Sequence, residues 1–179
     1  MAEATPHHTI KFPKLDAPAK VLIVVAPYYK EIAKDLVKGA RRALRKAGAE
    51  AELVEVPGAL EVPSAIALAE ASGRYDGYVA LGCVIRGETT HYETVCNDSS
   101  RALSELGLRG VCLGNGILTV ENVAQAQVRA DPKQGDKGFG AAEAALHLIR
   151  LKREFAATST PDNGTTFRPA SENIVVAKG

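Results

Sequence analysis

An apolar run at residues 78–85, YVALGCVI, constrains the fold more than any other part of the chain. Eight residues with almost no polar side chain are typical of a strand buried on both faces, as in a parallel sheet. An Arg-Gly pair interrupts the run, and THYE at residues 90–93 then has the spacing of a helix-capping box. The stretch therefore predicts a buried strand, a short loop and a helix that begins near His91 with Thr90 as its cap.

The same order of strand, loop and helix recurs along the chain, with Gly or Pro at most of the breaks. Strands are expected at residues 20–26, 51–56 and 78–85, and a fourth strand and its loop begin at residue 110, with Asn115 to Thr119 in the loop. Helices are expected at residues 32–47, 64–71, 91–106, 119–129 and 141–155, with Thr119 as the cap of the fourth helix. Right-handed crossovers between such units give a doubly wound sheet. We therefore predict an α/β fold: a flavodoxin-like, three-layer αβα sandwich with a four-stranded parallel sheet and an N-terminal arm.

A length of 179 residues favours a single domain. Residues 1–19 are polar and contain several prolines, and we expect them to form the arm. Residues 20–155 should form the folded domain. Residues 156–179 are rich in Thr, Ser, Pro and Asn without helical periodicity, which predicts a flexible tail.

Composition and motifs exclude several classes of function. A net charge of +1 and the absence of Trp argue against nucleic acid and against an anionic membrane as partners. No apolar stretch approaches the length of a membrane span, and the first residues lack an apolar signal core. Three cysteines without a CxxC pair indicate reduced thiols in the cytoplasm. We expect neither a metal site nor a cofactor, because His91 has no partner ligand and the dinucleotide and P-loop signatures are missing.

The loops that follow the strands should meet at one edge of a parallel sheet, where ligands bind in such folds. These loops supply tyrosines, a carboxylate, an Arg, threonines, a His and an Asn, which suits a polar organic substrate that carries a phosphate. A helix N-terminus disfavours a protonated imidazole, so His91 should be able to accept a proton. A histidine in a first helical turn is nevertheless more often a solvated surface residue, and Arg86 is equally consistent with a plain surface charge. An acid–base pair of Glu61 and Glu88 is disfavoured, because Glu88 would repel a neighbouring phosphate.

Four ordered motifs carry a resemblance to a known family: PGALEVP at residues 57–63, GCVIRGETTH at 82–91, GNGILTVEN at 114–122 and KG at 137–138. They closely resemble 6,7-dimethyl-8-ribityllumazine synthase, between about residues 20 and 150. The resemblance implies a transferase that condenses 5-amino-6-(D-ribitylamino)uracil with 3,4-dihydroxy-2-butanone 4-phosphate. The product is 6,7-dimethyl-8-ribityllumazine, phosphate and water are released, and no metal or organic cofactor takes part. This is the penultimate step of riboflavin biosynthesis.

The resemblance also implies a role for particular residues. His91 would transfer protons. The ribitylaminouracil would be bound by Tyr28, Ala59, Leu60, Glu61, Cys83, Val84, Ile85 and Asn115, and the butanone phosphate by Glu88, Thr89, Arg129 and Lys137. Tyr28 would stack on the pyrimidine ring and Glu61 would accept hydrogen bonds from the ribityl hydroxyls. The sequence departs from many family members at PYY (residues 27–29), where Arg-Phe-Asn is common, and at Leu60 and Asn115, where Phe is frequent.

Family members assemble as pentamers with shared active sites, and some form hollow shells of 60 subunits. We therefore expect a homopentamer, possible assembly into a 60-subunit shell, and two small-molecule substrates as the other partners. Asn115, Arg129 and Lys137 would reach across the interface. Two alternatives stay open at this point, a binding module that holds a flavin or lumazine without turnover and a shell-forming paralogue. His91 and Arg129 argue against the binding module, which needs neither a base nor a site for a leaving phosphate. The intact set of polar loop residues argues against a shell protein that has lost catalysis.

Overall fold

A computed structural model describes residues 10–158 of the chain. Four parallel strands form one sheet in the order β2-β1-β3-β4. The strands are β1 (Lys20–Val25), β2 (Glu50–Glu55), β3 (Gly77–Ile85) and β4 (Leu113–Val120). The helices are α1 (Lys30–Lys46), α2 (Glu61–Glu70), α3 (His91–Leu108), α4 (Val123–Ala130) and α5 (Lys137–Thr158). The predicted flavodoxin-like fold is confirmed.

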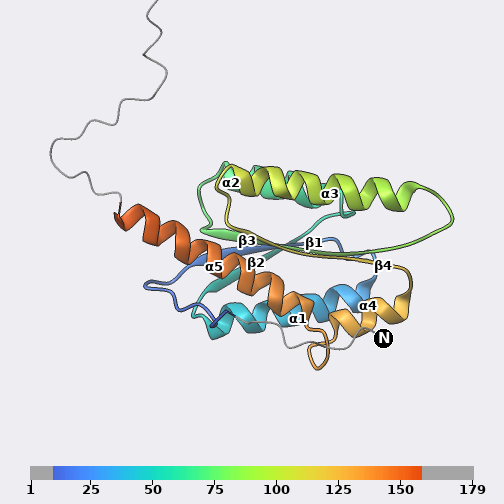
Figure 1. The fold of residues 1–179 in the computed structure, drawn as a ribbon, viewed down its shortest axis with the longest axis horizontal. Coiled ribbons are helices and arrows are strands. Elements are labelled where there is room, and N and C mark those ends of the chain that lie inside the picture. The colour runs from blue at the N-terminus through green and yellow to red at the C-terminus, as the bar shows by residue number, and fades with distance from the viewer. Residues whose placement is uncertain (1–9, 159–179) are drawn as a thin grey trace, which may run out of the picture.

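The sheet lies between two layers of helices, with α2 and α3 on one face and α1, α4 and α5 on the other (Figure 1). β3 pairs with β1 on one side and with β4 on the other, and its first seven residues are buried. Alternate side chains of β3 enter the two cores: Val79 and Leu81 pack under α1 and α5, whereas Tyr78 and Ala80 pack under α2. The apolar run of the sequence is thus the central strand of the domain.

Helix α5 lies unusually close to its neighbours, because glycines remove the side chains at the contacts. A Cβ atom built on Gly138 would lie 2.0 Å from the Leu36 carbonyl oxygen in α1. One built on Gly114 of β4 would lie 1.8 Å from the Ala141 carbonyl oxygen in α5. These contacts bind the first turns of α5 to both α1 and β4, and that region carries Lys137.

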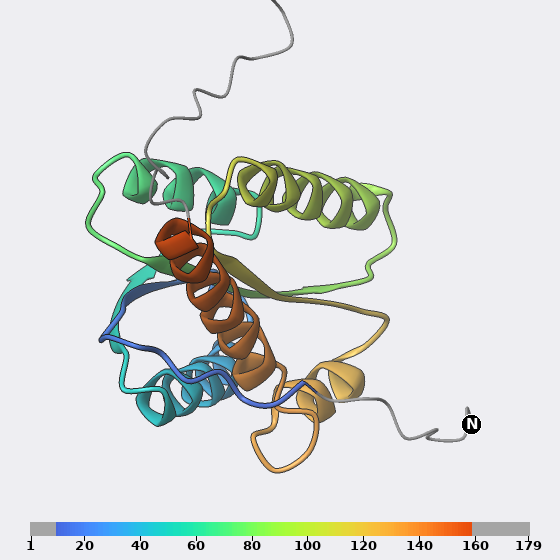
Figure 2. The same cartoon turned by 60° about the vertical axis from the view of Figure 1, so that its left-hand side comes forward.

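The described part of the N-terminal arm lies against its own chain. In Figure 2 the blue segment that leads into β1 crosses the layer of α1 and α5. The Phe12 and Phe139 rings pack with their centroids 5.7 Å apart, and the Lys46 ammonium lies 4.2 Å from the centroid of the Phe12 ring. The Arg153 guanidinium donates to the carbonyl oxygens of Ala17 and Pro18, at 2.7 and 3.0 Å. Residues 1–9 lie outside the described residues.

Several predicted boundaries are wrong. The fourth strand runs from Leu113 to Val120, so Asn115 to Thr119 lie in a strand and not in a loop. Thr119 does not cap α4; Asn122 does, and its side-chain oxygen accepts a hydrogen bond from the Gln125 N–H at 3.0 Å.

Helix ends also differ from the prediction. Helix α2 begins at Glu61, with Pro63 in its first turn, where a missing N–H costs nothing. Helix α5 spans Lys137–Thr158, so the first three residues of the predicted flexible tail are helical. The remainder of that tail, 159–179, lies outside the described residues.

The close packing of α5 can be tested with two glycines of the same helix. Gly138→Ala should lower the free energy of unfolding by about 1–3 kcal/mol or more, because its Cβ would meet the backbone of α1. Gly140→Ala is the matched control, since its Cβ would meet no atom within 4 Å. The control should raise stability by about 0.5–1 kcal/mol through its higher helix propensity. Urea unfolding midpoints measure both, and equal midpoints would contradict the packing argument.

Candidate active site

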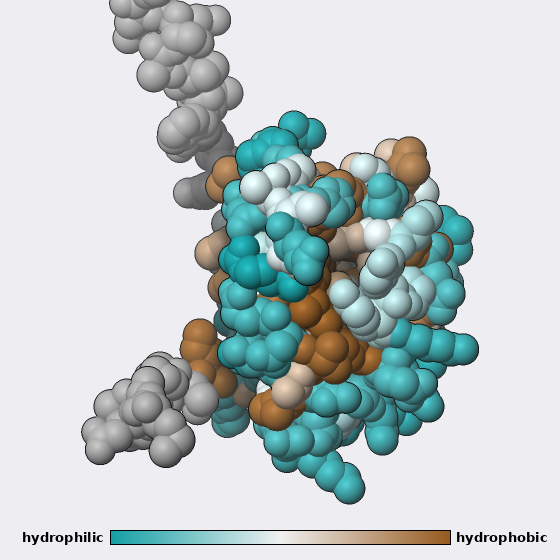
Figure 3. Space-filling view, turned by 90° about the vertical axis from the view of Figure 1, so that its right-hand side faces the viewer, coloured by the Kyte–Doolittle hydropathy of each residue, from teal (hydrophilic) through white to brown (hydrophobic). Residues whose placement is uncertain are grey.

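A cavity of about 440 Å³ opens at the edge where the strands end. Figure 3 looks onto this edge and shows an apolar hollow between polar surfaces. The cavity is lined by the ends of β1 and β3, the loop that leads into α2, and the first turns of α3. It brings together these residues predicted from the sequence: Tyr28, Ala59, Leu60, Glu61, Cys83, Val84, Ile85 and His91.

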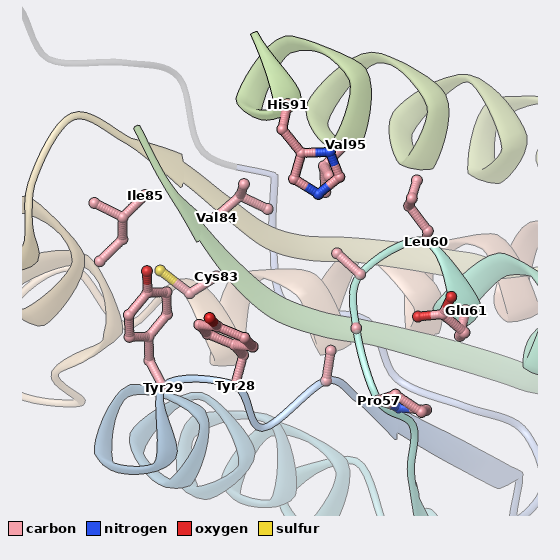
Figure 4. Close-up of a pocket in the computed structure, with 13 residues that line it drawn as sticks. Tyr28, Tyr29, Pro57, Leu60, Glu61, Cys83, Val84, Ile85, His91 and Val95 are labelled. Carbon is pink, nitrogen blue, oxygen red and sulfur yellow. The ribbon is translucent and has the colours of Figure 1, made fainter. Parts of the chain in front are cut away.

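The end of β3 forms the floor of the cavity. Figure 4 shows Cys83, Val84 and Ile85 on this strand beneath His91. Burial raises the pKa of the Cys83 thiol to about 11, so at neutral pH the sulfur is uncharged. The floor is therefore a neutral, mostly apolar surface with backbone groups at its upper end, which suits a flat heterocycle better than a charged ligand.

Two tyrosines stand opposite His91 in Figure 4. The Tyr28 and Tyr29 rings contact edge to face, with centroids 5.1 Å apart. Tyr28 is 76% exposed, so one of its faces is open to a ligand, whereas partial burial raises the pKa of Tyr29. Tyr29 buttresses Tyr28, and the exposed ring is the available stacking surface.

Glu61 lies at the other end of the cavity from the β3 floor, beside Pro57 (Figure 4). Its N–H donates to the Gly58 carbonyl at 3.2 Å, and this turn starts α2. An ideal Cβ on Gly58 would lie 3.0 Å from a carboxylate oxygen of Glu61, so the carboxylate folds over the turn. The cavity thus has an apolar middle with a carboxylate at one end and an imidazole at its rim.

His91 is the first residue of α3, as predicted, and its imidazole points toward the cavity (Figure 4). The predicted capping box is wrong. Thr90 adopts helical dihedral angles and makes no side-chain cap bond. Glu93 turns to the Arg86 guanidinium instead. The Glu93 carboxylate is therefore not available to the N–H groups at the start of the helix.

Glu88 and Thr89 are exposed in the loop between β3 and α3 and do not line the cavity. Thr89 accepts a long hydrogen bond from the His91 N–H at 3.4 Å. The loop therefore lies at the rim beside His91, where its backbone N–H groups and the start of α3 favour an anion.

The other predicted residues, Asn115, Arg129 and Lys137, line a second cavity of about 380 Å³ between β4, α4 and α5. The two cavities share no lining residue. The Asn115 side-chain oxygen accepts from the Ile117 N–H at 2.9 Å, and an Arg129 Nη1 donates to the Gln125 carbonyl at 3.3 Å. Within one chain, therefore, these three residues do not join the cavity that holds His91.

Sequence reasoning missed Ala26 and Val95 among the residues that line the cavity. Val95 could have been predicted from the sequence, because it lies four residues after His91 and therefore on the same face of the helix. No three His, Cys, Asp or Glu side chains within residues 10–158 gather as a metal site would require. In the same part of the chain, no helix has the length and apolar character to cross a membrane.

Comparison with known proteins identifies the family. The sequence profile of 6,7-dimethyl-8-ribityllumazine synthase matches residues 18–153. The chain belongs to this family. A curated 6,7-dimethyl-8-ribityllumazine synthase of Jannaschia sp. (strain CCS1) is 51% identical over 167 residues, which cover 93% of the chain and 92% of the relative. The synthase of Novosphingobium aromaticivorans is 58% identical over 138 residues, or 77% of the chain and 99% of the relative.

Both cavities lie inside the region that matches lumazine synthase. So do the departures noted in the sequence. Leu60 is 38% exposed at the wall of the first cavity, where a larger Phe is frequent in lumazine synthases. Asn115 lines the second cavity instead of an aromatic ring. Neither departure replaces His91, Glu61 or Arg129.

The buried thiol in the floor of this lumazine synthase cavity gives a pH prediction. Burial raises the Cys83 pKa from 9.0 to about 11, so the reactive thiolate appears only as the pH approaches 11. Below about pH 8.5, Cys83 should be alkylated by iodoacetamide roughly 10²-fold more slowly than a free thiol, and the difference should shrink as the pH rises toward 11. Mass spectrometry of the Cys83 peptide across pH 7–11 measures this. Alkylation at the free-thiol rate near pH 7.5 would contradict the assignment, and Cys83→Ser identifies the peptide.

Proposed function

We propose that the first cavity, completed by the second cavity of a neighbouring subunit, is the active site of a lumazine synthase. The enzyme condenses 5-amino-6-(D-ribitylamino)uracil with 3,4-dihydroxy-2-butanone 4-phosphate to form 6,7-dimethyl-8-ribityllumazine, with release of phosphate and water. The observation that carries the proposal is that eight residues implied by the family motifs line one cavity, with His91 facing it. Family membership favours this enzyme over a binding module or a shell protein without turnover.

The first cavity suits the ribitylaminouracil. The exposed ring of Tyr28 and the neutral floor at Cys83 to Ile85 suit the flat pyrimidine. The backbone groups at the end of β3 supply hydrogen bonds to its carbonyl and N–H edges. Glu61 is the carboxylate at the far end, and it accepts hydrogen bonds from hydroxyls of the flexible ribityl chain. Ala59 and Leu60 line the path between the two ends.

The phosphate of the second substrate requires positive charge and N–H donors. The loop at Glu88 and Thr89 and the start of α3 supply N–H groups at the rim of the cavity. Arg129 can bind two phosphate oxygens at once, and Lys137 adds a second cation from the same cavity. Neither cation forms an ion pair with an acidic side chain of residues 10–158, so both are available to an anion.

His91 serves the proton transfers of the reaction. The 5-amino group attacks the ketone carbonyl, and loss of water gives a Schiff base. Removal of a proton from carbon then expels phosphate, and the ribityl nitrogen closes the second ring with loss of water. Each step moves a proton to or from carbon, nitrogen or oxygen, and a positioned imidazole contributes roughly 10²–10⁴-fold to such steps. Holding two reactants together contributes much of the rest.

The division of the site between two cavities supports a cyclic assembly, which we take to be a homopentamer. β4 is an edge strand: within residues 10–158 it pairs with β3 alone, and the second cavity lies against it. A head-to-tail interface would set the Arg129 cavity of one subunit beside the His91 cavity of the next and would close into a ring. Further assembly into a 60-subunit shell and a cytoplasmic location stay predictions.

Loss of the imidazole should lower turnover. His91→Ala should reduce kcat by roughly 10²–10⁴-fold, because the proton transfers lose their positioned group. His147→Ala, at a half-buried histidine of α5 outside both cavities, is the matched control and should keep the wild-type kcat. The lumazine absorbance band, corrected for a blank without protein, measures the rate. A wild-type rate equal to the blank, with lumazine still bound, would instead support the binding module.

Subunit mixing tests whether the site is shared. His91→Ala and Arg129→Ala chains, each inactive at low butanone phosphate concentration, are co-expressed in equal amounts with different tags. If neighbouring subunits share a site, about one quarter of the sites in random rings carry both natural residues, so activity returns. If each chain holds a complete site, no chain in the mixture has both residues and activity stays absent. Separately purified variants combined after assembly serve as the control.

A further inference from the structure

Arg86 occupies the junction between the floor of the first cavity and the helix that carries His91. We infer that Arg86 is a positioning residue, which sets the orientation of His91 by fixing the first turn of α3. The inference rests on the proposed function of His91 and extends it to a residue that touches neither substrate. The sequence alone leaves Arg86 as an ordinary surface charge.

The Arg86 side chain joins two elements. Its Nε donates to a Glu121 carboxylate oxygen at 2.8 Å, just after the end of β4. Its Nη1 donates to the Glu93 carboxylate, and its guanidinium carbon lies 4.1 Å from the centroid of the Tyr92 ring. The Arg86 backbone N–H donates to the Val120 carbonyl at 3.0 Å and anchors the residue to β4. One guanidinium thus holds the two residues that directly follow His91.

The first turn of α3 depends on these contacts because its usual support is missing. Thr90 makes no side-chain cap bond, and the loop at residues 86–90 is exposed. The bond from the His91 N–H to Thr89 is long, at 3.4 Å. The cap that the sequence predicts would have used Glu93, but that carboxylate is bound to Arg86. The arginine therefore replaces the cap as the link between α3 and the sheet.

Two other roles fit Arg86 less well. It does not line the cavity, and two carboxylates already neutralise its charge, so it is a poor ligand for a phosphate. The side chains of Arg86, Glu93 and Glu121 are 41%, 48% and 56% exposed, and such exposed ion pairs contribute little to folding. The planar guanidinium between two carboxylates does supply a defined geometry, and the ammonium group of a lysine does not reproduce it.

Steady-state kinetics of the full-length assembled enzyme test the inference. Arg86→Gln should lower kcat by about 10–100-fold, because small misplacements of a catalytic group cost rates of this size. KM for each substrate should stay within about twofold, as expected when ground-state binding is unchanged. Arg86→Lys should not restore kcat. Arg101→Gln is the matched control: Arg101 also binds two carboxylates of α3, Glu105 at 2.6 Å and Asp98 at 3.4 Å, and its loss should leave kcat unchanged.

A double variant separates positioning from a general structural effect. If Arg86 acts through His91, then Arg86→Gln should cause no further loss of kcat in a His91→Ala background. An additive loss would overturn the inference, as would a wild-type kcat in Arg86→Gln. A raised KM for butanone phosphate with an unchanged kcat would also overturn it, since Arg86 would then be a phosphate ligand.

Two controls keep the result interpretable. If Arg86→Gln fails to assemble, Glu121→Gln removes one carboxylate with little change in shape, and it should lower kcat in the same direction; an unchanged kcat would overturn the inference. Failure of the proposed function looks different, because the wild type would then be no faster than the blank, or His91→Ala would keep the wild-type kcat.

Discussion

Burial of β3 on both faces and both edges is the constraint on which the rest of the structure depends. β1 and β4 occupy its hydrogen-bonding edges, and helices cover its two faces. A parallel strand in this position can expose only its ends to solvent. The end that follows Leu81 opens at the edge where the strands end, and there Cys83, Val84 and Ile85 form the floor of a cavity. The core and the site are therefore made by the same strand.

The polar groups around that floor are held by interactions whose energies are small but whose geometry is specific. Arg86 contacts the first turn of α3 through Glu93 and Tyr92 and reaches Glu121 after β4, and the Glu61 carboxylate lies over the turn at Gly58. The Arg86 guanidinium lowers the pKa of Glu93, so this carboxylate stays charged and bound over the neutral pH range. Because the Glu93 and Arg86 side chains are exposed, their ion pair contributes little to the free energy of folding. Its role in the proposed site is to orient the first turn of α3.

The sequence predicted the fold well because apolar periodicity reports burial directly. The strands predicted at residues 78–85 and 51–56 correspond to β3 and to the edge strand β2, nearly at the observed bounds. Prediction from the sequence failed where a local sequence signal competes with a tertiary contact. Thr119 looked like a cap because nothing in the local sequence shows that β4 continues to Val120 beside β3. The capping box predicted at Thr90 does not form, because the Glu93 carboxylate pairs with the Arg86 guanidinium instead.

Prediction of the site residues succeeded and failed for the same reasons. Residues at the end of a strand, such as Cys83 to Ile85, and at the start of the next helix, such as His91, reach the cavity because these ends meet at one edge of a parallel sheet. Asn115 was misplaced in a loop, because its position depends on the register of β4 against β3.

The two cavities keep the imidazole and the cations of the candidate site apart within one subunit. The stacking surface and the imidazole lie on one side of the subunit fold, whereas the free cations lie beside the open edge of β4. A cation placed within the first cavity would face the neutral floor and the buried Cys83 thiol, where charge is costly without a partner. In the proposed assembly, the position of Arg129 and Lys137 on an outer face would keep both cations solvated until a neighbouring subunit and phosphate supply their partners. In such an arrangement, formation of the ring and formation of the phosphate site are a single event.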